Sequence, residues 1–295
     1  MRFSVVIPTR NRAATLRQTL AAVTAQDYPH YEVIVVDDGS TDDTAGMVAA
    51  EFPNVRLIRQ SNRGPAAARN RAIRESSGEV VAFTDDDCVP PGDWLTRLAE
   101  GYSRYPKVAG AGGRLEPPPD VLRHSVLARY ERFVAQSMYR VGDEDVLGGF
   151  ECPAGGTNNM SYRRAVLESA GGFDETFPYA AGEDADLKWR VCQAGAQILY
   201  IPITVEHLQA YTWQSFRRQA FRRGQGRARF EAKHGPRPSR GRSLLRLARR
   251  LARFPLDLVS ADRRPYAIVR AVEAWQNCRG EWDAIGSLHI WTSSM

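Results

Sequence analysis

The sequence predicts an α/β protein in which a mostly parallel sheet is covered by helices on both faces. Short, almost continuously apolar segments rich in β-branched residues alternate with helical patterns in the first third of the chain. Strands that are buried on both sides of a parallel sheet have this composition. Four segments carry the pattern, and they span residues 3–7, 32–36, 55–58 and 79–84.

Three helical stretches separate these segments and are expected to cover the sheet. The first spans about residues 13–25 and repeats apolar residues at helical spacing. The second runs to about residue 51 from Thr41 or Asp42, either of which can cap it. The third spans about residues 62–76. The resulting order is β-α-β-α-β-α-β, as in a doubly covered parallel sheet.

Polar residues follow each of the four predicted strands. The carboxyl ends of parallel strands meet at one edge of a sheet, where ligands bind in such folds. Four separate segments therefore deliver polar side chains to the same edge, which predicts a ligand site there. The clusters are Thr9 with Asn11, Asp37 with Asp38, Asn62 with Arg63, and Asp85 with Asp86 and Asp87.

The acidic triplet Asp85-Asp86-Asp87 is the most informative of these clusters. Neighbouring carboxylates raise one another's pKa and repel, so a cation stabilises them. Carboxylate oxygens suit a hard divalent ion such as Mg²⁺ or Mn²⁺. The alternative interpretation is a solvated acidic turn, since charge runs usually face water.

Several classes of protein are disfavoured by what the chain lacks. No GxGxxG follows the first strand and no GxxxxGK[ST] occurs, so dinucleotide redox cofactors and a P-loop are not expected. No apolar stretch reaches 18 residues, and Met1-Arg2 leads straight into a strand, so neither a membrane span nor a signal peptide is expected. The four cysteines show no CxxC pairing, which is typical of free thiols in a reducing compartment.

Charge is distributed unevenly along the chain. Residues 208–264 contain 16 Lys+Arg and 3 Asp+Glu, a net of +13, so the remainder carries −7 of the total of +6. Within this region, residues 243–258 read as a basic amphipathic helix. Its apolar face either lies in an anionic membrane interface or packs on protein. Nucleic acid is not expected as a partner, because the region lacks interleaved aromatic residues. The apolar residues on this face are Leu244, Leu247, Leu251, Phe254 and Leu258.

Polar residues in the second half of the chain are candidates for binding or catalysis. Asn158 and Asn159 lie in a glycine-rich stretch, where they contact a ligand or hold a turn. Glu183 and Asp184 open a helix that runs to about residue 194, where they are a catalytic pair or simple N-caps. His207 follows a last strand, where a lone histidine is usually a structural residue. Residues 281–295 show no clear pattern and are expected to be disordered or a terminal strand.

Taken together, these segments resemble the family-2 glycosyltransferases of the GT-A fold over about residues 1–207. The motifs that carry the resemblance occur in order and at typical spacing. They are Val5-Val6-Ile7-Pro8-Thr9-Arg10-Asn11, Val35-Val36-Asp37-Asp38-Gly39-Ser40, Asn62-Arg63-Gly64, Ala68-Arg69-Asn70, Phe83-Thr84-Asp85-Asp86-Asp87, Gly172-Phe173-Asp174-Glu175 and Gly182-Glu183-Asp184-Ala185-Asp186-Leu187.

The resemblance implies an enzyme that moves a sugar, with inversion, from a nucleotide diphosphate sugar to a hydroxyl of a glycan or lipid-linked glycan. The donor is expected to carry uridine diphosphate. The implied catalytic base is Asp184. The implied metal site, for Mn²⁺ or Mg²⁺, consists of Asp85, Asp87 and His207, and the implied sugar contacts are Asn158, Asn159 and Glu183. The implied nucleotide-binding residues are Pro8, Thr9, Asn11, Asp38, Arg69, Asp85 and Asp86.

The resemblance also implies a division of the chain. Residues 1–115 are expected to bind the nucleotide sugar, residues 116–210 to bind the acceptor and supply the base, and residues 211–295 to form a basic, mainly helical region. We expect a cytoplasmic protein that is either free or peripheral at the inner membrane face, and either a monomer or a homo-oligomer. Two alternatives stay open: a non-catalytic subunit that binds sugar nucleotides or glycans, and a sugar nucleotidyltransferase.

Overall fold

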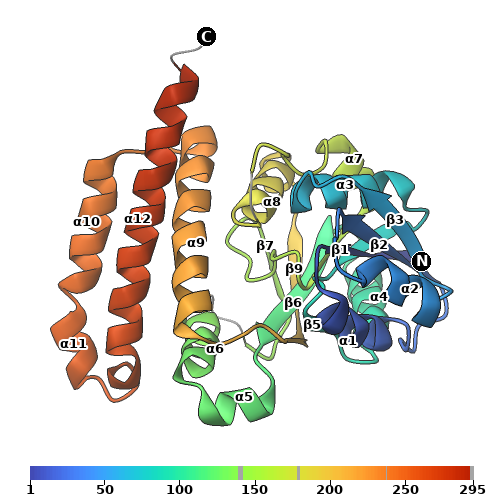
Figure 1. Cartoon of the computed structure of the whole chain (residues 1–295), viewed down its shortest axis with the longest axis horizontal. Coiled ribbons are helices and arrows are strands. Elements are labelled where there is room, and N and C mark those ends of the chain that lie inside the picture. The colour runs from blue at the N-terminus through green and yellow to red at the C-terminus, as the bar shows by residue number, and fades with distance from the viewer. Residues whose placement is uncertain (139–141, 178–179, 237, 293–295) are drawn as a thin grey trace. The chain divides into compact units, whose positions relative to one another are not determined.

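The chain folds into two compact units in a computed structural model (Figure 1). The structure describes residues 1–138, 142–177, 180–236 and 238–292. The α/β unit contains residues 1–118, 133–180 and 184–209. The helical unit contains residues 119–132, 181–183 and 210–295.

One mixed sheet forms the centre of the α/β unit, and its described strands follow the order β3-β2-β1-β4-β8-β6-β9-β5, with β7 beside β9. The four strands expected from the sequence pair in parallel as β3-β2-β1-β4. The strands are β1 (Phe3–Thr9), β2 (Tyr31–Asp38), β3 (Arg56–Gln60), β4 (Val80–Phe83), β5 (Cys88–Val89), β6 (Gly110–Glu116), β7 (Val146–Gly148), β8 (Met160–Arg163) and β9 (Ile198–His207).

Successive side chains of the central strands enter two different apolar cores. In β1, Val5 and Ile7 join one core, whereas Val6 joins the core on the opposite face of the sheet. The near-continuous apolar composition of the strand follows from this, because both faces are covered. The covering helices are α1 (Ala13–Val23), α2 (Thr44–Glu51), α3 (Pro65–Glu75), α4 (Trp94–Arg104), α7 (Arg164–Ser169) and α8 (Glu183–Gln193).

Strand β1 continues through Pro8 to Thr9, two residues beyond the end expected from the sequence. The pairing of β1 with β4 ends at Val6, while the pairing with β2 continues to Thr9. Proline, which has no N–H to donate, therefore lies where one side of the strand needs no partner. This extension places Thr9 at the edge of the sheet where the acidic triplet follows β4.

The helical unit is built mainly on two long helices, α9 (Trp213–His234) and α12 (Ala267–Thr292), which pack closely on each other. A Cβ added at Gly280 would lie 1.9 Å from the carbonyl oxygen of Phe221, and one at Gly224 would lie 2.0 Å from that of Asn277. Glycine at both positions therefore lets the two backbones approach. The shorter elements are α10 (Arg240–Leu251), α11 (Phe254–Val259) and η1 (Arg264–Tyr266).

One expectation about this part of the chain needs correction. Residues 281–292 belong to α12, so they are neither disordered nor a strand, and residues 293–295 lie outside the described part. Ala284 and Ile285 are buried against Ala228, which gives this segment its packing.

Residues 119–132, with α5 (Pro119–His124) and the start of α6 (Val126–Met138), group with the helical unit rather than with the preceding strands. Tyr130 explains this grouping, because its ring contacts Phe216 and Tyr266 and its hydroxyl donates to Glu273 at 2.7 Å.

Among the described helices, none is long and apolar enough to span a bilayer.

Candidate functional site

The polar groups that follow β1 and β4 meet at the edge of the sheet. Because these strands are parallel neighbours, Thr9 and the acidic triplet lie side by side. The Thr9 hydroxyl donates to Asp86 Oδ2 at 2.7 Å, and both side chains are buried. The predicted convergence of the first and fourth segments is therefore present in the structure.

Asp86 and Asp87 are adjacent and buried, yet their pKa values move in opposite directions. Burial raises the pKa of Asp86 to about 7, although the charge of Arg12 and the hydrogen bond from Thr9 oppose this. Burial acts in the same direction on Asp87, but hydrogen bonds and charge from His207 and Arg12 outweigh it and lower the pKa of Asp87 to about 2. Asp87 is thus the fully ionised member of this pair at neutral pH.

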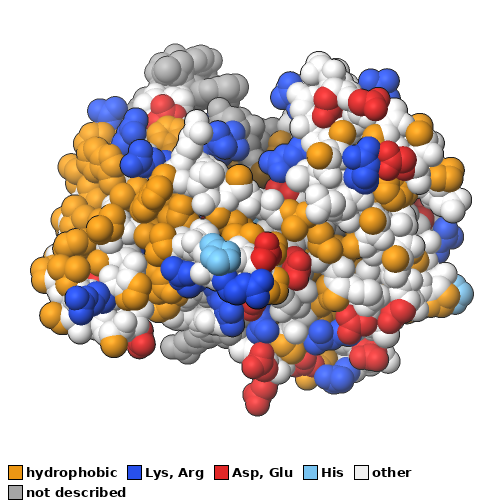
Figure 2. All heavy atoms as spheres, turned by 60° about the horizontal axis from the view of Figure 1, so that its bottom comes forward, with side chains coloured by type: hydrophobic (Ala, Val, Ile, Leu, Met, Phe, Trp, Pro, Cys, Tyr) orange, Lys and Arg blue, Asp and Glu red, His pale blue; other side chains and the backbone are white. Residues whose placement is uncertain are grey.

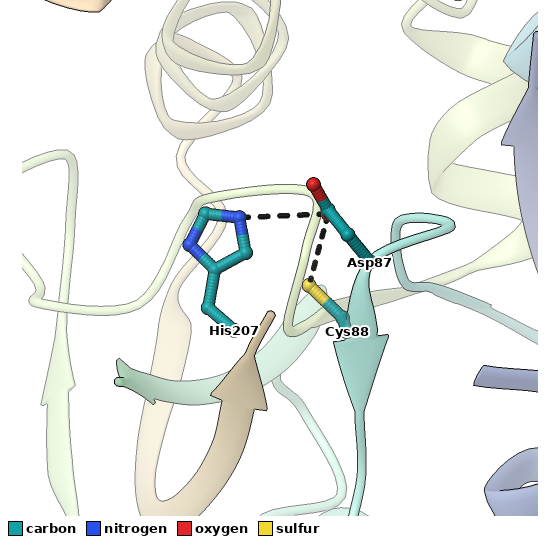
Figure 3. Close-up of side chains that lie close together, drawn as sticks. All are labelled: Asp87, Cys88 and His207. Carbon is teal, nitrogen blue, oxygen red and sulfur yellow. Dashed lines mark hydrogen bonds and ion pairs between the residues drawn. The ribbon is translucent and has the colours of Figure 1, made fainter. Parts of the chain in front are cut away.

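His207 approaches Asp87 from the end of β9 (Figure 3). Antiparallel pairing of β5 with β9 sets Cys88 opposite His207, and the backbone N–H of Leu208 donates to the carbonyl of Asp87 at 2.7 Å. The imidazole Nε2 lies 3.5 Å from Asp87 Oδ1, and the Cys88 Sγ lies 3.9 Å from the same oxygen. Asp87, Cys88 and His207 each offer one ligand atom, and these atoms lie within 4.8 Å of one another.

The chemistry of these donors suits a divalent cation held by oxygen and nitrogen. Burial raises the pKa of the Cys88 thiol well above its usual value, so the sulfur stays protonated and is a poor ligand. Asp87 and His207 remain as an ionised carboxylate and an imidazole. Carboxylates suit Mg²⁺ and Mn²⁺, whereas an imidazole ligand favours Mn²⁺ over Mg²⁺, which prefers an all-oxygen shell.

Asp85 is bound by Arg69 rather than lying within the Asp87–His207 cluster. Arg69 Nη2 donates to Asp85 Oδ1 at 2.8 Å, and the guanidinium lies over the ring of Phe173. The arginine side chain is buried on α3, so its position is fixed by packing as well as by charge. The expected metal set of Asp85, Asp87 and His207 is therefore only partly gathered, with Asp87 and His207 together and Asp85 on its arginine.

Asp184 lies at the start of α8, where the sequence placed the candidate base. Its Oδ1 accepts from the backbone N–H of Ala185 at 2.7 Å. Burial raises the pKa of Asp184, the bond from Ala185 and the charge of Arg69 lower it, and the charge of Asp85 raises it further. Arg69 thus acts electrostatically on the predicted base while it binds the first carboxylate of the triplet.

The neighbouring acids of α8 differ from Asp184 in their surroundings. Asp186 is buried and pairs with Arg190 at 2.9 Å, and Arg190 also donates to the carbonyls of Ala170 and Gly172. Asp186 therefore helps to hold the preceding loop. Glu183 is buried as well, at the first position of the helix.

Asp38 organises the loop that follows β3. Its carboxylate accepts from Gln60 Nε2 and from the backbone N–H groups of Arg63 and Gly64, each at 2.8 Å. The amide of Asn62, oriented to satisfy both of its neighbours, donates to the same carboxylate at 2.9 Å. Asp38 is 4% exposed, so it positions the polar groups of this loop more than it offers a free oxygen.

Asn11 links the ends of β1 and β2. It has a positive φ of 53°, a conformation that asparagine tolerates better than most residues. Its Oδ1 accepts from the N–H of Thr41 at 2.7 Å, and its own N–H donates to Ser40 Oγ at 2.9 Å. Pro8 precedes this turn within β1. Asn11 and Pro8 thus shape the edge of the sheet near the triplet.

Asn159 is used inside the protein. Its Nδ2 donates to the carbonyls of Arg114 and Ile203, each at 3.0 Å, and its Oδ1 accepts from the indole N–H of Trp94 at 3.0 Å. With 1% of its surface exposed, it has no group to offer a sugar, so the expected sugar contact at this position is corrected to a structural one. Asn158 is less enclosed, and its backbone carbonyl accepts from the Thr84 hydroxyl at 3.2 Å.

Three residues near the predicted ones were not expected from the sequence. Arg12 Nη1 donates to Asp87 Oδ2 at 2.7 Å, so a guanidinium lies on the triplet. Lys188 is buried one helical turn after Asp184, and its Nζ donates to the carbonyls of Cys152 and Ala154 at 2.5 and 2.6 Å. Cys88 was visible only as a free thiol. The i, i+4 spacing of Asp184 and Lys188 could have indicated their proximity.

Comparison with known proteins identifies the family. Residues 4–170 match the sequence profile of Glycosyl transferase family 2, and the chain belongs to this family. Its α/β unit has the GT-A fold.

Individual relatives agree with this assignment. The chain is 34% identical over 212 residues to the Pre-mycofactocin glycosyltransferase of Mycobacterium tuberculosis, covering 68% of this chain and 41% of that protein. It is 32% identical over 233 residues to Glycosyltransferase AglE of Haloferax volcanii, covering 76% of this chain and 72% of that one. The chain thus spans less than half the length of the mycobacterial relative.

Two solved structures share the fold. One is the mannosyltransferase PcManGT of Pyrobaculum calidifontis in complex with GDP-Man and Mn²⁺, with a TM-score of 0.58, 21% identity and coverage of 100% of this chain and 76% of that chain. The other is S. aureus TarS 1-349 in complex with UDP, with a TM-score of 0.60, 20% identity and coverage of 96% and 91%.

Proposed function

We propose that the chain transfers a sugar from a nucleoside diphosphate sugar to an acceptor hydroxyl, inverting the anomeric carbon, with Asp184 as the base. One observation carries the proposal: the charge of Arg69 acts on both Asp85, which it binds at 2.8 Å, and Asp184. The group that would receive a proton and the group that would face a diphosphate thus share one fixed cation. Transfer with inversion requires a base near the acceptor and a stabilised leaving group on the opposite face of the sugar.

Asp184 is suited to the role of base by its surroundings. Burial raises its pKa, and a base is most effective when its pKa approaches the working pH. It lies at the N-terminus of a helix, where the macrodipole favours the ionised form that must accept the proton. The carboxylate would take the hydroxyl proton of the acceptor as the oxygen attacks.

We infer that Asp87 and His207 hold the divalent ion, and that Mn²⁺ fits better than Mg²⁺. The ionised carboxylate and the imidazole lie 3.5 Å apart, close enough to share one ion. When bound, such an ion supplies Lewis-acid stabilisation of the charge that develops on a departing diphosphate. Arg12, which now bonds to Asp87, would turn to another partner when the ion binds.

The remaining polar residues at this edge of the sheet are proposed to hold the nucleotide. Pro8, Thr9 and Asn11 shape the end of β1, and Asp38 fixes the loop of residues 60–64. In this arrangement Thr9 and Asp86 are joined by their hydrogen bond and act together. Asn158 and Glu183 stay proposals for contacts with donor or acceptor sugar.

The donor is proposed to be a uridine diphosphate sugar, and the acceptor a glycan or lipid-linked glycan. Structural neighbours of this fold have been crystallised with UDP and with GDP-Man, so both nucleotides belong in the test. A lipid-linked acceptor would place the enzyme at the inner face of a membrane.

The test is release of nucleoside diphosphate from a panel of UDP-, GDP- and dTDP-sugars, with Mn²⁺, Mg²⁺ or chelator. The Asp184→Asn variant should lose turnover while still binding donor. Asp93→Asn is the matched control, because Asp93 also lies at the N-terminal end of a helix but is exposed and makes no cap hydrogen bond. Full acceptor-dependent turnover by Asp184→Asn, or a product that retains the donor's anomeric configuration by NMR, would contradict the proposal.

A further inference from the structure

The helical unit exposes an unusual amount of apolar surface. Of the thirteen large hydrophobic side chains that are exposed in the described residues, ten lie between Trp213 and Trp282. Figure 2 shows hydrophobic side chains gathered over the region of α10 and α12. Contiguous exposed patches of this kind mark interaction sites more often than isolated apolar residues do.

Helices α10 and α11 present the clearest part of this surface. Leu244, Ala248 and Leu251 follow one another at helical i, i+4, i+7 spacing, and all are exposed. A neighbouring row of exposed apolar residues runs beside them. We call these two rows the docking face, and they consist of Leu244, Leu245, Ala248, Leu251, Ala252, Pro255, Leu256, Leu258 and Val259.

The opposite face of α10 already has a partner within the unit. Leu247 is buried against Ala274 and Cys278 of α12, and Ser243 is buried one turn earlier. Leu247, one of the five residues predicted to share one apolar face, therefore packs within the protein. Three other residues of that set are exposed to solvent instead: Leu244, Leu251 and Leu258.

Arginines border the docking face. Arg242, Arg249 and Arg253 are exposed at i, i+7 and i+11, along one side of the apolar rows. An apolar face edged by arginines is the pattern of helices that lie in the headgroup region of anionic membranes.

Several acidic side chains of the same unit bind other arginines. Arg246 donates to Glu231 at 3.0 Å and to Glu281 at 2.7 Å, and Arg270 donates to Asp257 at 2.6 Å. Residues 210–295 contain 18 Lys+Arg and 6 Asp+Glu, a net of +12. The unit therefore carries an excess of positive charge, which attracts an anionic partner.

We propose that the docking face binds the surface of an anionic phospholipid bilayer, with its apolar rows inserted among the headgroups and acyl chains. Charge complementarity selects this occupant over a second copy of the chain. A dimer through this face would bring together two helical units that each carry a net charge of +12, which is repulsive. The attachment is peripheral, since the described helices include no membrane span.

This inference does not depend on the proposed transfer reaction. It rests on exposure and charge in the helical unit alone. If the proposed lipid-linked acceptor is correct, the same bilayer would present it.

The experiment is vesicle flotation of the full chain without nucleotide or metal. Vesicles contain phosphatidylcholine alone or phosphatidylcholine mixed with phosphatidylglycerol. Wild type should float with the anionic vesicles, bind the neutral ones at least about tenfold more weakly, and be released by salt, because screening weakens attraction to charged headgroups.

Two double variants test the two parts of the docking face. Leu256→Glu with Val259→Glu places charge in the apolar rows, and Arg249→Glu with Arg253→Glu reverses the border. Each should weaken anionic-vesicle binding about tenfold or more. Controls of the same chemistry in the α/β unit are Leu147→Glu, at an exposed strand position, and Arg74→Glu, at an exposed helix position, which should bind like wild type. Thermal melts check that every variant folds.

Three results would overturn the proposal. Wild type stays unbound to anionic vesicles, or the Leu256→Glu/Val259→Glu variant floats like wild type. In the third, sedimentation shows that wild type is a dimer and that the Leu256→Glu/Val259→Glu variant is a monomer, while neither protein binds vesicles. That result would mean that a second copy of the chain covers the docking face. Normal turnover on a soluble acceptor by a variant that no longer floats leaves the proposed function intact, and loss of turnover by Asp184→Asn leaves vesicle binding intact.

Discussion

The two units of the chain use acidic and basic side chains in different ways. In the α/β unit, carboxylates lie close together at the edge of the sheet. Arg12, at the N-cap of α1, and Arg69, within α3, donate hydrogen bonds to them. In the helical unit, acids such as Glu231 and Glu281 are tied to Arg246, and the surplus arginines are exposed. A surplus of partly buried carboxylate suits a cation, whereas a surplus of exposed arginine suits an anionic surface.

Burial explains why the two arrangements have different consequences. At the edge of the sheet, loss of solvation moves the pKa of Asp86 up to about 7, and strong local partners move that of Asp87 down to about 2. At the border of the docking face, Arg249 and Arg253 are exposed to water, where each contributes little until an oppositely charged surface approaches. Chemistry is therefore expected in the first unit and attachment in the second.

The largest expected effect is on turnover in the α/β unit. Asp184→Asn should lower kcat by about 10²- to 10⁴-fold, the range for loss of a general base. Vesicle binding should not change, because that property belongs to the other unit. Steady-state release of nucleoside diphosphate measures the first quantity and flotation the second. A variant that lost both would show that the units are not functionally separable.

The next largest effect concerns the metal. Asp87→Asn removes the ionised carboxylate beside His207 and should weaken Mn²⁺ binding about tenfold or more. Mn²⁺ binding to the free protein can be followed by electron paramagnetic resonance without any donor. Glu168→Gln, at an exposed residue paired with Arg164, is the control. Unchanged Mn²⁺ affinity in Asp87→Asn would place the ion elsewhere.

Much of the sheet and part of the site could be predicted from the sequence. Continuous β-branched runs indicate buried parallel strands, and parallel neighbours must bring their carboxyl ends together. The contact of Thr9 with Asp86 follows directly from these two facts. The position of Asp184 at the start of a helix follows from the helical pattern after Gly182.

Other features depend on contacts that no local pattern records. The approach of His207 to Asp87 depends on the antiparallel register of β5 on β9, and β5 is only two residues long. The enclosure of Asn159 depends on Trp94, Arg114 and Ile203, which come from three separate elements.

The second half of α12 was missed for a different reason. Its packing on α9 relies on Gly280, which allows close approach of two backbones, while glycine within a helix normally argues against one. Small and large apolar residues also alternate around the helix rather than forming one stripe. Tertiary packing therefore outweighs the weak local signal.

A smaller effect distinguishes the buried face of α10 from the exposed docking face on α10 and α11. Leu247→Ala should lower the free energy of unfolding by about 2–3 kcal/mol, because Leu247 is 7% exposed and leaves a cavity beside Ala274 and Cys278. Leu256→Ala should change it by less than about 0.5 kcal/mol, because Leu256 is 62% exposed. Denaturant unfolding of both variants measures the contrast. Equal costs would mean that the docking face is covered within the protein.

The smallest expected effect is a gain of stability on substitution of Asp184, the proposed base. The pKa of Asp184 is raised in the folded protein, so the folded state holds its proton more tightly than the unfolded state does. Above the folded pKa the ionised carboxylate destabilises the fold, and below the unfolded pKa the difference vanishes. Asp184→Asn should therefore melt at a higher temperature than wild type at neutral pH, and this difference should shrink as the pH falls. Thermal melts across pH, with Asp93→Asn as control, measure it, and a lower melting temperature for Asp184→Asn at neutral pH would mean that the ionised carboxylate stabilises the fold instead.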